Sequence, residues 1–387
     1  MSKLKQKTIL FIVHNYTNFQ KDQIESIAPF FKRVYVLFRY KPLAEIGGML
    51  NLSSFKKHLY RNCFDQLDIP DNVQVFPTSV YYLPTNKAYF RLGRQHYRQA
   101  LRAITQKNIS YDLIHSHFAW SAGYVGHQLK QYSNKPFVLT THRYDIKELP
   151  YINSNWNRSI TDVCRSADVL VTCSYKNVES TSKLNSSLKP MVIPNGFNSK
   201  KFFKMDQKKA RQYLKLPSQA KIIVSVASLD FRKGHHLLIS AVAKLKNRMN
   251  LQLYIIGSGK QKKQLLKQIS DLDLSDNVHL VGEVNHHDIN RWMNAADISI
   301  LPSQDEGNPT VMFESLATDV GGISEVLTAE TGLVFPTASV QTVMSAMTKA
   351  FSISWDRAKI ARIARQYRWD EIAKKYLELY KSVLTTN

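Results

Sequence analysis

The sequence predicts an α/β protein with two Rossmann-like, doubly wound parallel-sheet domains. Short apolar runs alternate with amphipathic or polar stretches along the chain, as in TILFIVH, RVYVLF, YDLIHSH and PFVLTTH. Such alternation is typical of βαβ units, whose parallel strands are buried on both faces. It pauses at a lysine-dense connector after IPNGFN and resumes with KIIVSVASL. A chain of 387 residues also exceeds what one core usually organises, so we expect two domains.

The pause in the strand pattern sets the expected domain boundary. Residues 1–198 contain the runs from TILFIVH to MVIPNG, and residues 199–367 contain KIIVSVASL, LQLYIIG, VHLVGEV and DISILPS. Residues 368–387 have apolar side chains at helical spacing, and we expect this helix to cross back to the first domain. Open parallel sheets bind ligands outside the carboxyl ends of their strands, so the cleft between the two domains is the expected site.

Composition restricts the class of protein. The formal charge of +23 favours anionic partners such as nucleic acid, anionic lipid or phosphorylated substrates. No RNA-reading or DNA-reading motif is present, so we expect no nucleic acid partner. The three cysteines lack any paired spacing, which is typical of reduced thiols in a cytoplasmic protein. No apolar run reaches the length that spans a bilayer, so any membrane role would be peripheral.

The stretch EGNPTVMFE contains the most specific chemical pattern. Pro309 fits the first position of a helix and Asn308 fits its cap, so the free N–H groups of that helix would face the exit of the strand DISILPS. Such a terminus favours a pyrophosphate. Glu306 would then reach the group beyond the phosphates, and Glu314 would accept hydrogen bonds from paired hydroxyls such as those of a ribose. The alternative is two unrelated glutamates, one in a loop and one on a solvated helix face.

Several segments, taken in order, resemble one known family. AADISILPSQDEGNPTVMFESLA resembles the Glu-x7-Glu motif of retaining glycosyltransferases with the GT-B fold, in particular family 4 (glycosyl transferases group 1), and VASLDFRKGHHLLISAV is similar to that family's phosphate-binding segment. YDLIHSHFAWSAGYVG, FVLTTHRYDI and SADVLVTCSYKNVE resemble its acceptor-domain signatures. The resemblance implies an acceptor-binding first domain and a nucleotide-sugar-binding second domain. It also implies transfer of a sugar from a UDP- or GDP-linked donor to a glycan or lipid-linked acceptor, with retention at the anomeric carbon.

The same resemblance implies roles for individual residues. The catalytic group would be Glu306, His142 and Lys233, with Glu306 and His142 near the donor sugar. The donor-binding group would be Arg232, Lys233, Gly307, Asn308, Pro309, Thr310 and Glu314, in which Arg232 and Lys233 neutralise the diphosphate. The acceptor side would have His117 and Arg143. Two alternatives stay open: Arg232 and Lys233 in a solvated basic turn, and His117 and His142 as satisfied histidines without a substrate role.

No metal or cofactor is expected. The GSG at 257–259 lacks the third glycine of a dinucleotide motif and favours a tight strand-to-helix turn. The DxD spacing at 271–276 lies between a helix and a strand, where we expect a solvated loop. Arginine and lysine would supply the positive charge that a metal otherwise provides. One departure concerns Ser228, where many relatives carry an arginine.

The segment KAYFRLGRQHYRQALRAI predicts a helix with a basic arc. Its cations recur every three or four residues and share an arc of roughly 80°; they are Lys87, Arg91, Arg94, Arg98 and Arg102. An apolar stripe of Phe90, Tyr97, Leu101 and Ile104 adjoins the arc, which suits a helix lying on the anionic inner face of a membrane. The alternative is a helix that packs on the core and has a solvated basic face.

The family pattern breaks after Ala317. Relatives continue with a turn and a buried strand, roughly seven residues, whereas Ala317 here runs directly into Thr318. We expect a gap in the chain between these two residues, because the segments on both sides look intact. A true deletion would instead favour a catalytically impaired GT-B nucleotide-binding subunit. Another GT-B sugar enzyme is a further alternative.

Overall fold

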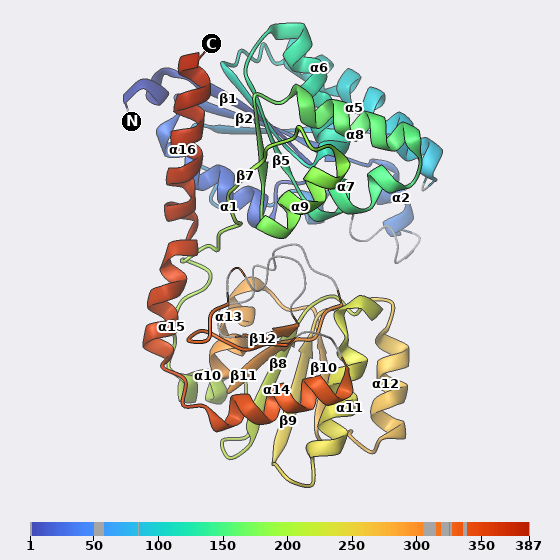
Figure 1. Ribbon diagram of the computed structural model, residues 1–387, viewed down its shortest axis with the longest axis vertical. Helices are drawn as coiled ribbons and strands as arrows, with labels where there is room; N and C mark the ends of the chain where they lie inside the picture. The colour runs from blue at the N-terminus through green and yellow to red at the C-terminus, as the bar shows by residue number, and fades with distance from the viewer. Residues whose placement is uncertain are drawn as a thin grey trace. The chain divides into compact units, whose positions relative to one another are not determined.

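A computed structural model describes residues 2–49, 58–83, 85–304, 315–318, 325, 327–335 and 339–386. The chain forms two compact units, one of residues 1–196 with 369–387 and one of residues 197–368 (Figure 1). Each unit contains one parallel sheet covered by helices. The predicted α/β class with two doubly wound sheets is confirmed.

The sheet of the first unit has seven parallel strands in the order β3-β2-β1-β4-β5-β6-β7. The strands are β1 (Thr8–Val13), β2 (Arg33–Tyr40), β3 (Val73–Ser79), β4 (Leu113–His117), β5 (Phe137–Thr141), β6 (Val169–Thr172) and β7 (Met191–Val192). From β1 the chain goes first toward β2 and later returns to β4 on the other side. The switch point of this sheet therefore lies between β1 and β4.

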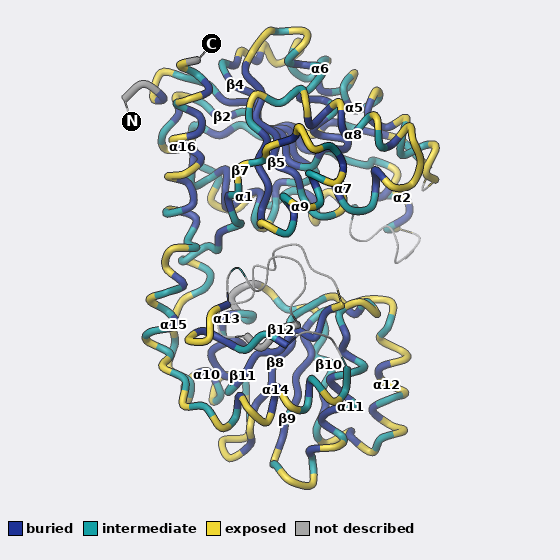
Figure 2. The backbone as a smooth tube through the Cα atoms, viewed as in Figure 1, coloured by how far each residue is buried: buried dark blue, intermediate teal, exposed yellow. Residues whose placement is uncertain are grey.

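Helices cover both faces of this sheet. Its α-helices are α1 (Asn18–Ile27), α2 (Leu43–Met49), α4 (Tyr60–Cys63), α5 (Asn86–Gln106), α6 (Tyr124–Ser133), α7 (Arg143–Lys147), α8 (Ser154–Ser166), α9 (Tyr175–Leu184) and α16 (Trp369–Thr386), and its short helical turns are η1 (Ser2–Gln6), η2 (Ala28–Phe30), η3 (Ala119–Gly123) and η4 (Leu149–Tyr151). Alternate residues of β1 enter different cores: Ile9 and Phe11 pack with α1 and α16, whereas Leu10 and Ile12 pack with α5, α6 and α8. Figure 2 shows the strands between these layers as buried.

The sheet of the second unit has six parallel strands in the order β10-β9-β8-β11-β12-β13. The strands are β8 (Lys221–Val226), β9 (Leu251–Ile256), β10 (Val278–Gly282), β11 (Ile298–Leu301), β12 (Ser315–Thr318) and β13 (Val334–Phe335). The helices are α10 (Gln207–Tyr213), α11 (His235–Leu245), α12 (Lys262–Asp271), α13 (His286–Ala295), α14 (Val340–Ser352) and α15 (Arg357–Ala364), with the turns η5 (Phe231–Lys233) and η6 (Arg365–Tyr367). The switch point lies between β8 and β11.

The predicted gap between Ala317 and Thr318 is wrong. β12 runs through both residues and pairs in parallel with β11 and β13, with Ala317 opposite Leu301 and Val334, and Thr318 opposite Phe335. The helix expected to begin at Pro309 does not include residues 315–317, because these belong to β12. A short apolar run fits either a helix or a buried strand. Here the run supplies the strand between β11 and β13, so the sheet is continuous without the additional segment that the resemblance implied.

Candidate active site

Three histidines gather at the carboxyl edge of the first sheet. His14 follows β1, His117 ends β4 and His142 follows β5. His117 Nδ1 lies 3.3 Å from His142 Nε2. The ring of Phe118 connects the group, because its centroid lies 4.3 Å from that of His14 and 4.2 Å from that of His142. The switch point between β1 and β4 therefore carries a cluster of imidazoles.

Asp145 fixes the backbone around this cluster. Its buried carboxylate accepts hydrogen bonds from the backbone N–H of Ala119 at 2.5 Å and from that of His142 at 3.2 Å. It thereby joins the loop after β4 to the loop after β5. Burial raises the pKa of Asp145 to about 7, although the two backbone donors oppose this shift. His14 Nε2 lies 3.0 Å from the carbonyl oxygen of Trp120. This contact connects the loop after β1 to the loop after β4.

The imidazoles of the cluster are neutral near pH 7. Burial lowers the pKa of His142 to about 3, and burial is also the main cause that lowers the pKa of His14 and of His117 well below the ordinary value. Cys173 Sγ lies 3.6 Å from His142 Nδ1, and burial raises the pKa of this thiol to about 12. The cluster can therefore donate and accept hydrogen bonds, but it carries no formal positive charge.

Arg143 follows His142 in the chain and forms an ion pair with Glu148. Its guanidinium lies 2.5 Å from Glu148 Oε1. The predicted acceptor residues His117 and Arg143 are thus at the same sheet edge, one as a buried ring and the other as a paired cation. Nothing in these contacts assigns either residue an acceptor.

In the second unit, the loop after β8 carries the predicted phosphate-binding cations. Asp230 accepts a hydrogen bond from the backbone N–H of Arg232 at 3.1 Å and lies 3.2 Å from its guanidinium Nε. Hydrogen bonding by the Arg232 backbone also lowers the pKa of Asp230. Lys233 follows, directly before Gly234 and the start of α11. Two cations therefore precede the amino end of a helix, where backbone N–H groups also favour an anion.

This loop is joined closely to the exit of β11. Gly234 has φ +72°, and a Cβ there would lie 2.0 Å from the carbonyl oxygen of Pro302. The backbone N–H of Gln304 donates to the Arg232 carbonyl at 2.7 Å. The basic loop is thus held at the switch point between β8 and β11, and the segment that contains Glu306 and Glu314 continues from the same place.

The GSG segment at residues 257–259 also contacts the loop after β8. The Leu229 N–H donates to the Ser258 carbonyl at 2.8 Å, and the Gln261 N–H donates to the Leu229 carbonyl at 3.0 Å. A Cβ on Gly257 or Gly259 would lie 2.1 or 2.4 Å from a carbonyl oxygen of the loop after β8. These glycines therefore allow two loops to approach closely, as expected for a tight turn.

Part of the predicted donor site lies outside the described residues. It comprises Glu306, Gly307, Asn308, Pro309, Thr310 and Glu314. Among the residues that the structure describes, no group of three or more histidine, cysteine or acidic side chains is placed to hold a metal ion.

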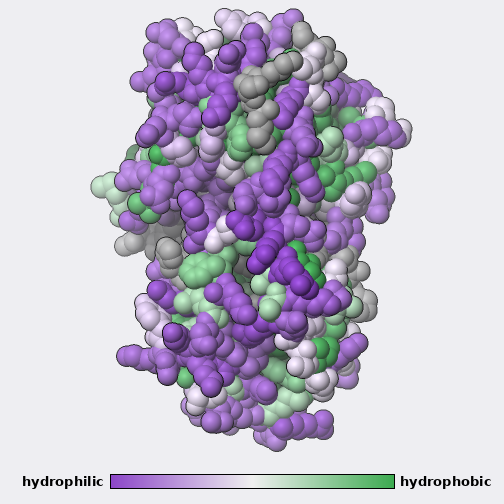
Figure 3. Space-filling view, turned by 90° about the vertical axis from the view of Figure 1, so that its left-hand side faces the viewer, coloured by the Kyte–Doolittle hydropathy of each residue, from purple (hydrophilic) through white to green (hydrophobic). Residues whose placement is uncertain are grey.

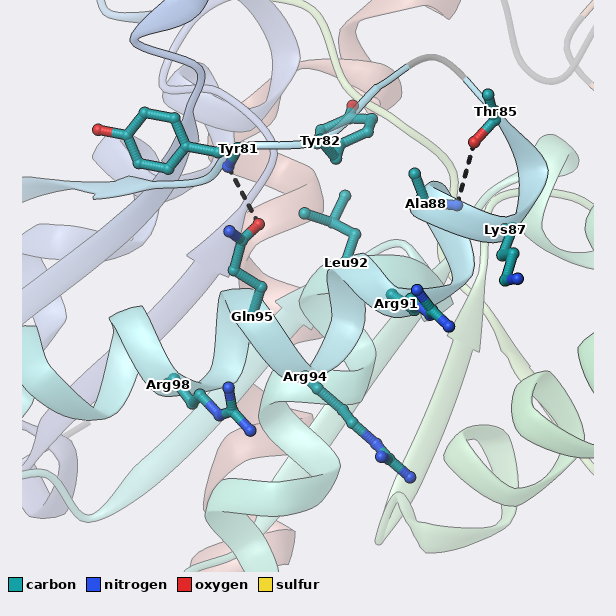
Figure 4. A pocket seen from close by; sticks show the side chains of 10 residues that line it. All are labelled: Tyr81, Tyr82, Thr85, Lys87, Ala88, Arg91, Leu92, Arg94, Gln95 and Arg98. Carbon is teal, nitrogen blue, oxygen red and sulfur yellow. Dashed lines mark hydrogen bonds between the residues drawn. The ribbon is translucent and has the colours of Figure 1, made fainter.

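The predicted basic helix is α5, and its two faces have different surroundings. Lys87, Arg91, Arg94 and Arg98 line an open groove of about 650 Å³ together with Tyr81 and Tyr82, and Figure 4 shows the four cations projecting from α5. The apolar stripe beside them is not exposed for a membrane as predicted, because Phe90, Tyr97, Leu101 and Ile104 pack against the core. Gly93 is also explained by packing, since a Cβ there would lie 2.6 Å from the Trp120 ring.

Arg102 continues the basic arc toward the end of α5 and is exposed, like Lys87, Arg91, Arg94 and Arg98. Within the described ranges, we find no helix with the length and apolar character needed to cross a bilayer. The alternative of a core-packed helix with a solvated basic face describes α5 best.

Sequence reasoning missed His14, Phe118, Asp145 and Cys173. All four lie just after a strand or inside the following helical turn. In a doubly wound sheet, a polar residue just after a strand is by itself a candidate site residue, because the carboxyl ends of parallel strands lie at one edge of the sheet. Their mutual distances, however, depend on the strand order, which the sequence does not state.

Two units, each with a doubly wound parallel sheet and polar side chains at its switch point, form the architecture of GT-B glycosyltransferases. Two family models match the chain: one described as Glycosyltransferase Family 4 over residues 58–201, and one described as Glycosyl transferases group 1 over residues 206–367. The chain belongs to the GT-B glycosyltransferases of the family 4 type.

Two glycosyltransferases are similar in sequence to this chain over most of its length. TuaC of Bacillus subtilis, assigned as a teichuronic acid biosynthesis glycosyltransferase, is 28% identical over 294 residues, which cover 73% of this chain and 72% of TuaC. The D-inositol 3-phosphate glycosyltransferase of Corynebacterium urealyticum is 28% identical over 335 residues, covering 78% of this chain and 77% of that protein.

Solved structures match over nearly the whole length. Sucrose-phosphate synthase of Thermosynechococcus elongatus has a TM-score of 0.79 at 21% identity, with 99% of this chain and 100% of that chain covered. HepE of Anabaena in complex with UDP has a TM-score of 0.72 at 20% identity, with 97% and 100% covered. At these identities the likeness supports the fold alone.

Proposed function

We propose that this glycosyltransferase moves a sugar from a nucleoside-diphosphate donor, UDP- or GDP-linked, to a glycan or lipid-linked acceptor. The reaction retains the configuration at the anomeric carbon and requires no metal. The observation that carries the donor assignment is the loop of Asp230, Arg232, Lys233 and Gly234, held by backbone contacts at the switch point of the second sheet. UDP is the first donor nucleotide to test, because the similar HepE was solved with UDP and with UDP-glucose.

On the donor side, the proposed reaction breaks the bond between the anomeric carbon and the oxygen of the terminal phosphate. The nucleoside diphosphate leaves with the bonding electrons, and its charge grows as the bond breaks. Arg232 and Lys233 stabilise that charge, as does the amino end of α11. Glu314 holds the ribose hydroxyls, Glu306 contacts the donor sugar, and residues 307–310 belong to the same donor-binding group.

On the acceptor side, a hydroxyl oxygen forms the new bond on the face that the diphosphate leaves, and its proton passes to a diphosphate oxygen. His142 contributes as a neutral hydrogen-bonding group near the sugar, because burial lowers its pKa to about 3. His117 and Arg143 belong to the acceptor side of the same sheet edge. Their contacts to His142 and Glu148 order this edge before substrate arrives.

The acceptor proposal includes a membrane surface. The exposed cations of α5 are Lys87, Arg91, Arg94, Arg98 and Arg102. In this proposal they attract anionic headgroups at the cytoplasmic face of the membrane, while the buried stripe of the helix stays in the core. Attraction is thus electrostatic, without insertion of α5.

A thermal-shift panel with UDP, GDP, ADP and their sugars tests the donor assignment. A ligand at a hundred times its Kd stabilises the folded protein by about 2.7 kcal/mol. We expect the response to be lost in Lys233→Ala and kept in Lys267→Ala, a matched control whose exposed lysine pairs with Asp271 on α12. Product formation from the responding donor then separates an active enzyme from a subunit that only binds nucleotide. No response to any nucleotide would overturn the proposal.

A further inference from the structure

The second unit contains an apolar cavity away from the basic loop. Its volume is about 430 Å³, within the range of small-molecule sites. Its apolar lining comprises Phe197, Phe202 and Phe203, with Met293 of α13 and Ile360 of α15. Figure 3, which views the face that carries α15, shows hydrophobic side chains interrupting a hydrophilic surface. None of residues 228–234 lines this cavity.

Two asparagines of α13 line the cavity, and their side chains bond to the connector. Asn290 Oδ1 accepts from the Phe203 N–H at 3.1 Å, and Asn294 Oδ1 accepts from the Met205 N–H at 2.8 Å. Asn294 Nδ2 donates to the Phe203 carbonyl at 3.0 Å. These bonds hold the connector against α13 and occupy both amide oxygens and the Nδ2 atom of Asn294. The remaining interior is therefore suited to an apolar group.

The charged residues that line the cavity are all cations. They are Lys204, Arg365 and Arg368, and no acidic side chain is among the lining residues. Lys204 and Arg365 are exposed, so they stand where the cavity meets solvent. An occupant with a negative group at one end would place that group near these cations and its apolar part among the phenylalanines.

From this combination we propose that the cavity binds a single-chain amphiphile with an anionic head group, of the fatty-acid type. The apolar part of the ligand contacts the three phenylalanines, Met293 and Ile360. The carboxylate faces Lys204 and Arg365. The site is independent of the donor-nucleotide assignment, because it shares no residue with the basic loop.

The cavity lies where the chain enters and leaves the second unit, so a bound ligand would affect both connecting segments. The cavity is lined by the segment after Gly196, where the chain enters the second unit, and by Arg365 and Arg368, where the chain leaves it. A bound amphiphile would contact both connecting segments at once and restrict their movement relative to α13 and α15.

Isothermal titration of the full-length protein with dodecanoate, below its micelle concentration, tests the proposal. We expect saturable binding with one site, and weaker binding of dodecanol and dodecyltrimethylammonium, which share the chain but lack the negative charge. Lys204→Glu with Arg365→Glu should weaken dodecanoate binding by about tenfold or more. Lys349→Glu with Arg362→Glu is the matched control with the same change in charge, since both residues are exposed and neither lines the cavity.

A second variant tests the apolar part. Ala361→Met fills the cavity, and Ala361→Trp fills it further if the protein still folds by circular dichroism. Both should weaken dodecanoate binding, while nucleotide-induced thermal shifts stay as in the wild type. Absence of saturable dodecanoate binding to the wild type would overturn the proposal. So would equal binding of the three amphiphiles, or equal effects of the cavity double variant and the control double variant.

Discussion

The Nδ1 atom of His115 lies 2.7 Å from the hydroxyl oxygen of Tyr380, a residue 265 positions later in the chain. His115 is on β4 and Tyr380 is on α16, and both side chains are fully buried. The other ring nitrogen of His115 lies 2.8 Å from Thr140 Oγ1 on β5. Burial lowers the pKa of His115 to about 3, so the ring is neutral, with one nitrogen donating and the other accepting. A polar contact inside an apolar core thus fixes the position of α16 on the first sheet.

Tyr380→Phe is expected to destabilise the protein by about 1–3 kcal/mol, because it leaves a buried ring nitrogen of His115 without its partner. Urea unfolding followed by circular dichroism measures the change. Tyr132→Phe is the control, since the Tyr132 side chain is 68% exposed and its hydroxyl can bond to water. A Tyr380→Phe cost no larger than that of Tyr132→Phe would show that the contact does not stabilise the fold.

Stability should fall as the pH falls below about 6.5, the ordinary pKa of histidine. The pKa values of His96, His115 and His142 are lowered to about 3 in the folded protein, mainly by burial. Between the two values the unfolded chain binds protons that the folded protein does not. Each such histidine therefore stabilises the fold fully above pH 6.5 and contributes about 1.4 kcal/mol less for each unit below it.

Urea unfolding at about pH 7.5, 6.5 and 5.5 measures this slope. His96→Gln keeps polar groups near Thr78 and Ser121 but cannot take up a proton, so it should flatten the slope. His279→Gln is a control, because His279 is only partly buried and its pKa is less strongly lowered. Equal slopes in the wild type and His96→Gln would contradict the assignment of the acid sensitivity to buried histidines.

Gly234→Ala is expected to disturb the basic loop of the second unit. The substitution places a side chain in a left-handed backbone conformation and puts its Cβ 2.0 Å from the Pro302 carbonyl oxygen. Gly282→Ala is the matched control, because Gly282 also has a positive φ, +91°, but nothing within 4 Å of its Cβ position. The control should cost only the backbone strain, about 1–2 kcal/mol. Gly234→Ala should cost more and should also weaken nucleotide binding, which thermal-shift titration would detect.

The fold could be predicted largely from the alternation of strands and helices, since parallel strands buried on both faces appear as continuous apolar runs. Three strands were not predicted. β3 contains Pro77, which is tolerated because β3 is at the sheet edge. β12 and β13 are short, four and two residues, and their identity as strands depends on the β11 neighbour rather than on local pattern.

Site residues could be predicted where they are neighbours in the sequence, as in the basic turn of Arg232 and Lys233. They could not be predicted where the signal depends on long-range packing. His14 and His142 both pack on Phe118 only because β1, β4 and β5 are neighbours in the sheet. Likewise, the spacing of Phe90 and Tyr97 gave the correct helix, but spacing cannot tell a stripe that faces the core from one that faces a membrane.

Replacing Arg91, Arg94 and Arg98 by glutamate should abolish sedimentation with anionic vesicles, if the exposed cations of α5 contact the membrane. The change reverses local charge without altering the buried face of α5. A control variant with Lys262, Lys263 and Lys267 of α12 replaced by glutamate carries the same net charge. The proposal requires that only the α5 variant loses vesicle binding and that both retain nucleotide binding. Equal loss in both would attribute the attraction to the overall charge of the protein instead.

Glu306 and Glu314 should differ in their kinetic effects. Both belong to the connection from β11 to β12, which starts at the switch point of the second sheet, beside the loop of Arg232. Glu314→Ala should mainly raise the donor KM, because contacts to the ribose are equal in the ground state and transition state. The expected cost is about 1.5–3 kcal/mol for hydrogen bonds to a charged group.

Glu306→Ala should mainly lower kcat, because a contact at the donor sugar strengthens as the anomeric carbon gains positive charge. Glu283→Ala is a useful control: Glu283 is exposed after β10 and its carboxylate bonds to the Ser258 hydroxyl. Initial-rate kinetics over a range of donor concentrations separates KM from kcat for each variant. If Glu306→Ala and Glu314→Ala both behave like the wild type, the glutamate pair has no role in donor recognition, and the cations before α11 must bind the donor without it.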